Sequence, residues 1–355
     1  MKRYGRQSSF TPLSCGASVF VAAALLSSPA NAQADALYLR VVDVGAGLCV
    51  VAVAPGDHAM VYDAGRGVDA CLKAVEELVP SKKIDLFVLS HSDGDHIGAA
   101  EAILAQNDIK TIIHPGDTRT EDLSALRTAI VTEPMADIWN MATRPVPIGT
   151  QFPLGPANVS FIAGWSDGNQ TRSHGEKKKL DDAMRKNALS LVVRLEFAGH
   201  SILITGDTVG RYQYAAGTAC EYAEHILVDN DIKLPLKSDV LIGQHHGADN
   251  ATSNCFIRKV EPQYVIFSAG NLYGHPRQST ADRLVANGVS PDKILRTDRG
   301  GFEKPKSKKS AQWIYGTFAG CRDTAGDDDI EVQLPADPAV PPRVKYLRPK
   351  DACEQ

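Results

Sequence analysis

The sequence lacks an apolar run long enough to cross a membrane, and it contains no Cys-x-x-Cys pair. Its N-terminal apolar run, residues 17–26, is well short of the ~20 residues that a spanning helix needs. Without a Cys-x-x-Cys pair, neither a dithiol redox motif nor a zinc ribbon is indicated. No repeat at a fixed period is evident either, which disfavours a repeat array.

Residues 1–32 have the features of a secretory signal peptide. Lys2, Arg3 and Arg6 give a positive start, the apolar run follows, and Ala30-Asn31-Ala32 is a small-x-small cleavage site. We expect cleavage before Gln33, a periplasmic or secreted protein, and no membrane span after cleavage. The alternative is an uncleaved anchor, which the short apolar run disfavours.

The predicted mature chain has no excess of basic residues. Loss of three basic residues with the signal leaves 35 Lys and Arg against 42 Asp and Glu, a net charge near −7. Proteins that bind nucleic acid non-specifically usually carry excess Lys and Arg. A nucleic-acid substrate would therefore be held locally, by metal and a few cations such as those at 177–179.

Signal removal would also leave an even number of cysteines: Cys49, Cys71, Cys220, Cys255, Cys321 and Cys353. An even set in an exported chain predicts up to three disulfides, with a connectivity that sequence does not reveal.

At 355 residues and 43% hydrophobic content, the chain can bury a full core. Apolar periodicity predicts an antiparallel meander, followed by alternating strands and helices. The predicted strands are 37–44, 48–54, 58–62, 84–89, 189–197, 201–205, 240–243, 264–268 and 293–297. The predicted helices are 69–79, 95–104 and 279–286. A polar insertion at 167–186 is a candidate lid, and residues after 301 suggest a covering tail.

The hexad at 91–96 carries the strongest chemical signal, because four candidate metal ligands occupy six residues directly after a buried strand. These are His91, Asp93, Asp95 and His96. Imidazole and carboxylate ligands together suit zinc, manganese or iron. The competing interpretation is a solvated loop in which Asp93 or Asp95 caps the next helix.

The ordered set of motifs resembles the metallo-beta-lactamase superfamily, and within it the hydrolase domain of the DNA-uptake protein ComEC and its free-standing secreted relatives. The motifs are VDVGAG at 42–47, YDAG at 62–65, HSDGDHIGA at 91–99, NALSLVVRLE at 187–196, LITGD at 203–207, QHHGA at 244–248, YGHP at 273–276 and RTDRGG at 296–301. Each string alone is weak, but their order, each near a predicted strand, is specific.

The resemblance implies an α/β fold, an αββα sandwich of two mixed sheets flanked by helices, with the metal site at one edge. The hydrolase domain would span 36–303, and 304–355 would be a C-terminal appendage. One or two divalent ions, zinc or manganese, would be bound. The implied ligands are His91, Asp93, Asp95, His96, a bridging Asp207, and one of His245 and His246.

Two positions depart from the superfamily's usual pattern. Asp93 stands where the hexad usually has a third His, a replacement found in the ComEC-like branch, which favours nuclease-like relatives over lactamases. The usual middle His is also missing, with Asn187 and Ser190 in the matching stretch, and His174 is a candidate replacement. Asp63 in the YDAG motif would shape its turn or support a ligand.

The implied function is an exported metal-dependent hydrolase, a phosphodiesterase or nuclease acting through a metal-bound hydroxide. Asp95 would orient the hydroxide, and His275 or Lys177 would serve the leaving group or the anion. The expected substrate is a small-molecule or nucleic-acid phosphodiester, and no protein partner is predicted. The alternatives are a lactone, lactam or other ester hydrolase, and a non-catalytic periplasmic binding protein on the same fold.

Overall fold

The structure is a computed structural model that describes Met1 and residues 35–116, 126, 128–130, 136–164, 180–211, 220–230, 234–297 and 329–347. The predicted signal peptide, the cations at 177–179, His174, Cys321 and Cys353 lie outside these residues.

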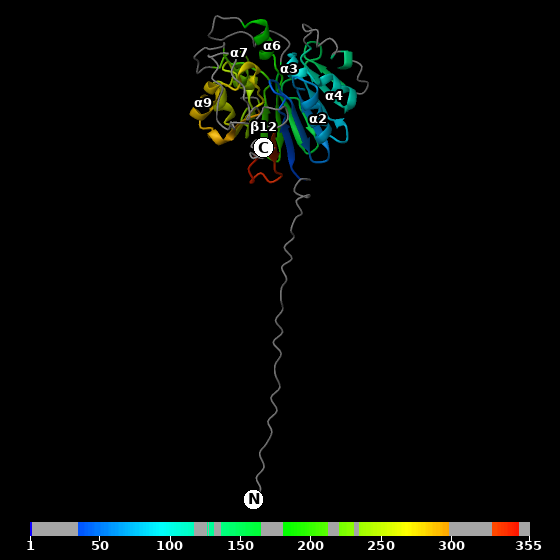
Figure 1. Cartoon of the computed structure of the whole chain (residues 1–355), viewed down its shortest axis with the longest axis vertical. Coiled ribbons are helices and arrows are strands. Elements are labelled where there is room, and N and C mark those ends of the chain that lie inside the picture. The colour runs from blue at the N-terminus through cyan, green and yellow to red at the C-terminus, as the bar shows by residue number, and fades with distance from the viewer. Residues whose placement is uncertain are drawn as a thin grey trace.

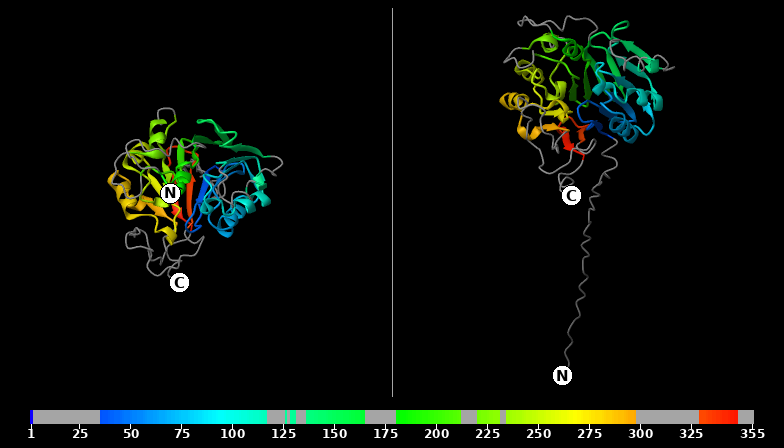
Figure 2. Two further views of the ribbon diagram at one scale, coloured as in Figure 1. Left: turned by 90° about the horizontal axis from the view of Figure 1, so that it is seen from above. Right: turned by 45° about the horizontal axis from the view of Figure 1, so that its top comes forward.

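Two large mixed sheets lie face to face, with helices on both outer flanks (Figures 1 and 2). The first sheet has the order β17 (Arg343–Tyr346), β16 (Ile330–Leu334), β1 (Leu37–Val41), β2 (Val50–Ala54), β3 (His58–Tyr62), β5 (Leu86–Val88), β7 (Thr111–His114) and β8 (Asp137–Asn140). The second has the order β15 (Ile294–Arg296), β14 (Tyr264–Phe267), β13 (Val240–Ile242), β12 (His200–Ile204), β11 (Val192–Phe197), β10 (Ala157–Ala163) and β9 (Gln151–Leu154). The predicted αββα architecture is confirmed.

In both sheets an antiparallel half continues into a parallel half. β3, β5, β7 and β8 are parallel in the first sheet, and β12 to β15 are parallel in the second. Beside the sheets lies a parallel pair, β4 (Lys83–Ile84) and β6 (Asp108–Ile109). The helices are α2 (Asp69–Leu78), α3 (Gly94–Ile97), α4 (Ala100–Gln106), α6 (Asp182–Ala188), α7 (Tyr222–Asn230), α8 (Asn254–Val260) and α9 (Gln278–Ala286). The part of the chain that the structure describes also has the short 3-10 helices η2 (Gln244–Gly247), η3 (Asn271–Tyr273) and η4 (Pro291–Lys293).

Alternating side chains of the strands build separate cores on the two faces of each sheet. In β12, Ile202 and Ile204 pack between the sheets, whereas Leu203 packs outward with residues of α8 and α9. In β2, Val51 likewise faces the outer core that contains residues of α2 and α4. Burial on both faces therefore fixes the order of layers as helix, sheet, sheet, helix.

Several predicted elements differ in their bounds. The predicted strand 84–89 is divided between β4 and β5, which belong to different sheets. The predicted helix 95–104 is divided into α3 and α4, and α3 already begins at Gly94, inside the hexad. The sequence analysis also did not predict several short elements with weak periodicity: β6, β7, β8, β9, β10, α6, α7 and α8.

The C-terminal segment differs from the covering appendage expected for 304–355. β16 pairs with β1 along its length, and β17 pairs with β16, so residues 330–346 complete the first sheet (Figure 1). Ile330, Val332 and Leu334 alternate into the core between the sheets. Short alternating strands of this kind are hard to recognise in a polar, proline-rich tail.

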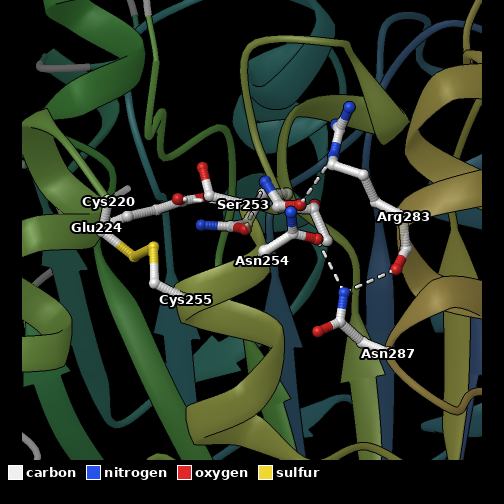
Figure 3. The surroundings of a disulfide bond; sticks show 9 residues. Cys220, Glu224, Ser253, Asn254, Cys255, Arg283 and Asn287 are labelled. Carbon is white, nitrogen blue, oxygen red and sulfur yellow. Dashed lines mark hydrogen bonds between the residues drawn. A yellow bond between two sulfur atoms is a disulfide. The ribbon is translucent and has the colours of Figure 1, made fainter. Parts of the chain in front are cut away.

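The described residues contain two disulfides, one on each flank of the sandwich. Cys49 bonds to Cys71 of α2, and Cys220 bonds to Cys255 of α8, where Glu224 lies beside the sulfur atoms (Figure 3). The sequence predicted an even cysteine set but not these pairs. Within the described ranges, no helix has both the length and the apolar character required to span a lipid bilayer.

Candidate metal centre

The parallel strands of both sheets carry the polar loops to one edge of the sandwich. Asp63 follows β3, His91 follows β5, Asp207 follows β12, and His246 lies in η2 directly after β13. Parallel strands present their carboxyl ends at a common edge, which is where α/β proteins commonly place binding residues. The loops therefore meet although they are up to about 180 residues apart in sequence.

Five of the predicted ligands form two overlapping compact groups. One group is His91, His96 and Asp207, and the other is Asp95, His96 and His246. His96 Nε2 lies 3.3 Å from Asp207 Oδ1, and His246 Nε2 lies 3.3 Å from Asp207 Oδ2. His246 Nε2 also lies 3.8 Å from Asp95 Oδ2. A buried cluster that mixes imidazole and carboxylate is suited to one or two divalent cations.

The three histidines of these groups, and the adjacent His245, each have Nδ1 in contact with an oxygen of a residue outside the cluster. His96 Nδ1 lies 2.7 Å from Asp63 Oδ2, and His91 Nδ1 lies 2.9 Å from Ser90 Oγ. His246 Nδ1 lies 2.8 Å from the Ser268 carbonyl oxygen, and His245 Nδ1 lies 2.8 Å from Asn250 Oδ1. Such contacts fix ring orientation and leave Nε2 for a metal. Asp63 thus takes the supporting position considered from the sequence. Ser90, Asn250 and Ser268 were missed, because an isolated Ser or Asn carries no sequence signal.

Two buried atoms in the cluster support the fit to a cation. His91 Nε2 and Asp207 Oδ1 are buried and have no hydrogen-bond partner among the described residues. A buried polar group without a partner is costly and requires an explanation. A cation between the imidazoles and Asp207 would satisfy both atoms.

The electrostatics of the cluster centre on Asp207. Burial would raise the pKa of Asp207, but His246, His96 and His245 hold it well below its usual range. Burial opposes charge on His96, yet Asp207 and Asp63 raise its pKa well above the ordinary value. In contrast, burial and the neighbouring His96 lower the pKa of His91. The surrounding histidines therefore favour the ionised form of Asp207, which is the form that can bind a metal ion.

Asp93 and His245 lie at the margin of the cluster and outside both compact groups. Asp93 accepts a contact from Lys186 Nζ of α6 through Oδ1, and its Oδ2 lies 3.7 Å from His91 Nε2. The Asn187 amide bridges His245 Nε2 at 3.0 Å and Asp93 Oδ2 at 3.2 Å. Lys186 was not singled out from the sequence. The sequence indicated that the superfamily's usual middle histidine is missing, and the described residues present the Asn187 amide in the matching stretch, with the Lys186 ammonium group beside it.

The backbone around the cluster is strained. Asp63, His245 and His246 all have positive φ (57°, 47° and 55°), a conformation that costs non-glycine residues on the order of 1–3 kcal/mol each. Gln244 holds η2 in place, because its amide donates to Thr208 Oγ1 and accepts from the Thr252 amide. Strain that the surrounding structure stabilises in this way is typical of binding sites.

The cluster opens into a cavity of about 660 Å³, a usual size for a ligand site. His275 lines this cavity, with its ring 5.8 Å from His245 and stacked on His246 at 6.5 Å. Burial, together with His245 and His246, holds the pKa of His275 well below its usual value. Arg66, Tyr273 and Arg277 complete the outer part of the cavity. These three were not predicted as site residues.

An αββα sandwich with a His/Asp cluster at one edge defines a class of metallohydrolase folds. A family model described as the metallo-beta-lactamase superfamily matches residues 42–245, more than half of the chain, and the chain belongs to this superfamily.

The curated relatives are competence proteins, which confirms the predicted resemblance to the ComEC-like branch. ComE operon protein 3 of Bacillus subtilis is 28% identical over 240 residues, which cover 67% of this chain and 26% of the relative. Competence protein ComA of Neisseria gonorrhoeae is 27% identical over 267 residues, covering 73% and 30% of the two chains. The chain thus spans less than a third of the length of these relatives. A solved metallo-beta-lactamase superfamily protein of Sulfolobus tokodaii is 17% identical with a TM-score of 0.35, over 63% of this chain and 84% of that one.

Proposed function

We propose that this chain is an exported metal-dependent hydrolase that cleaves phosphodiester bonds. The observation that carries the proposal is the convergence of four histidine Nε2 atoms on Asp207, each with its Nδ1 held by an oxygen of another residue. One or two divalent ions, zinc or manganese, would supply Lewis-acid activation of water and neutralise charge on the substrate. We assign His91, Asp95, His96, Asp207 and His246 as the ligands.

Residues that line the cavity complete the proposed chemistry, and its arginines favour an anionic substrate. Asp95 lies at the cavity wall, where its carboxylate can orient an attacking water. His275 lines the same cavity as a neutral imidazole and can donate a hydrogen bond to a substrate oxygen. Arg66 and Arg277 add positive charge at the mouth of the cavity. Guanidinium groups match the geometry of phosphate oxygens, which favours a phosphodiester over a neutral lactone or lactam.

Export is part of the proposal and has separate support. Both disulfides in the described residues require an oxidising compartment for their persistence. Together with the N-terminal signal features, they favour a periplasmic or secreted location. N-terminal sequencing of the protein recovered from the producing cell should begin at Gln33. Protein that still carries residues 1–32 would contradict the predicted cleavage.

The function is tested by elemental analysis of the purified chain, together with hydrolysis of bis(4-nitrophenyl) phosphate with added manganese or zinc. Asp95→Asn removes one carboxylate charge at the cluster, whereas Asp108→Asn makes the same change at an exposed position on β6. Bound metal with activity lost in Asp95→Asn alone supports the proposal. Bound metal with lactone hydrolysis in place of phosphodiester hydrolysis would refute the substrate class, and the absence of bound metal would favour a non-catalytic binding protein.

A further inference from the structure

An exposed aromatic ring stands at the mouth of the metal-site cavity. Tyr273 ends η3, and it lines the same cavity as Asp95 and Asp207 although 51% of it remains exposed. Its ring centroid lies 6.3 Å from that of His275, which in turn stacks on His246 with an interplanar angle of 17°. Planar groups therefore lead from solvent to the cluster.

Positive charge flanks this ring. The Arg66 guanidinium carbon lies 5.9 Å from the Tyr273 ring centroid, and among the described residues no carboxylate lies within ion-pair distance of Arg66. On the other side, Arg277 Nη2 donates to the Tyr273 carbonyl at 3.0 Å, which ties this arginine to η3. A guanidinium beside an aromatic face can contact a phosphate while a flat group stacks on the ring.

Of the four carboxylates that line the cavity, the two outside the proposed ligand set are paired with cations. Asp249 accepts from Arg283 at 3.1 Å and lies 3.6 Å from Arg211, and Asp93 contacts Lys186. These pairs offset the negative charge that would otherwise repel an anion approaching the cluster. The mouth thus favours an anion although the chain as a whole is acidic.

We propose that Tyr273, Arg66 and Arg277 form a subsite for one nucleotide unit, with the base stacked on Tyr273 and a phosphate held between Arg66 and the metal cluster. This inference rests on the proposed phosphodiesterase function and specifies its substrate class. Stacking on an aromatic side chain accepts any base, and the few local cations suit a single nucleotide or a strand end. The nucleotide can belong to a strand or be free.

Titration calorimetry with the metal-loaded chain tests the subsite. The probes are thymidine 5′-monophosphate, a phosphorothioate-linked thymidine dinucleotide, and deoxyribose 5-phosphate, which lacks the base. Tyr273→Ala should lower the affinity for both thymidine probes by on the order of tenfold and leave the affinity for deoxyribose phosphate unchanged. Tyr273→Phe should bind all three probes like the parent. Arg66→Gln should weaken all three probes, because each carries an anionic phosphate group.

The two thymidine probes distinguish the source of the nucleotide, since tighter binding of the dinucleotide would indicate a strand. Equal effects of Tyr273→Ala on thymidine phosphate and deoxyribose phosphate would overturn the subsite, as would no detectable binding of any probe. Metal content of each variant shows whether the cluster is intact. If the chain binds the thymidine probes through Tyr273 but does not hydrolyse phosphodiesters, the proposed function is refuted and the subsite stands. If Tyr273→Ala hydrolyses phosphodiesters and binds the probes like the parent, the subsite is refuted and the proposed function stands.

Discussion

Asp63 Oδ2 lies 2.7 Å from His96 Nδ1, and both side chains are completely buried. The same carboxylate accepts hydrogen bonds from the Ser90 amide (2.6 Å) and the Ser90 hydroxyl (2.7 Å). The Ser90 hydroxyl also contacts His91 Nδ1. One buried carboxylate therefore orients two of the candidate metal ligands.

Asp63→Asn should weaken metal binding by about 10- to 100-fold, because the amide no longer favours the ring orientation that exposes His96 Nε2. Competitive titration against a metal chelator measures the change. Asp85→Asn is the matched control, since Asp85 also holds a histidine Nδ1, that of His58 at 3.1 Å, but far from the cluster. Equal losses in the two variants would show that Asp63 acts only on stability.

Asp207→Asn and Asp93→Asn should differ in their effect on bound metal. Asp207 belongs to a compact ligand group, so its loss should weaken binding by more than roughly 100-fold, beyond the effect of supporting residues. Asp93 lies outside both groups and is held by Lys186, so its loss should cost about tenfold or less. Elemental analysis after dialysis compares the two. A chain that loses its metal equally in both variants would place Asp93 among the ligands.

Gly98→Ala should destabilise the fold despite the higher helix propensity of alanine. A Cβ at Gly98 would lie 2.5 Å from the Arg66 carbonyl oxygen and 2.6 Å from that of Gly65, both backbone atoms. Overpacking of this kind costs typically about 1–3 kcal/mol of unfolding free energy. Urea denaturation measures the cost, with Gly67→Ala as control, because a Cβ there meets no atom within 4 Å. Equal stability of Gly98→Ala and Gly67→Ala would refute the close approach of Gly98 to the carbonyl oxygens of Gly65 and Arg66.

Glu224→Gln should gain stability over the parent as pH rises. Burial raises the pKa of Glu224 above the ordinary value of a glutamate, although hydrogen bonds from Ser253 oppose the shift. The folded state therefore favours the protonated carboxyl. The stability that this preference gives the folded state is fully present below the pKa of Glu224 in the unfolded chain, and it is lost as pH rises through the pKa in the folded chain. The amide stays neutral and loses nothing.

As pH rises, the unfolding free energy of Glu224→Gln should increase relative to that of the parent. The total change should be about 1.4 kcal/mol for each unit that separates the folded and unfolded pKa values of Glu224. Denaturation at several values between about pH 4 and pH 8 measures this slope. Glu76→Gln on α2, an exposed position, should show a flat difference. A flat profile for Glu224→Gln as well would contradict the shifted pKa.

The sequence alone predicted most of the strands and the candidate ligands of the hexad, and the order of layers was predicted from the family resemblance. Apolar runs with alternating or continuous burial set the strands, and the hexad placed His91, Asp95 and His96 directly after one of them. These signals are local, because strand periodicity and metal-ligand spacing are both read within a few residues. The same locality explains why the strands β16 and β17 were missed, because β16 joins the sheet by pairing with β1, about 290 residues away in sequence, and β17 is placed by β16.

Only the tertiary structure decided which polar residues meet. The sequence left His245 and His246 equivalent. The turn of η2 brings His246 Nε2 to 3.3 Å from Asp207 and 3.8 Å from Asp95, whereas His245 Nε2 stays 3.9 Å from Asp207 and its ring contacts Asn187 and Asn250. Ser90, Ser268 and Tyr273 are unremarkable in sequence and acquire their positions from the carboxyl ends of parallel strands in two different sheets. Contacts between distant segments depend on how the sheets pack, and no local pattern encodes that packing.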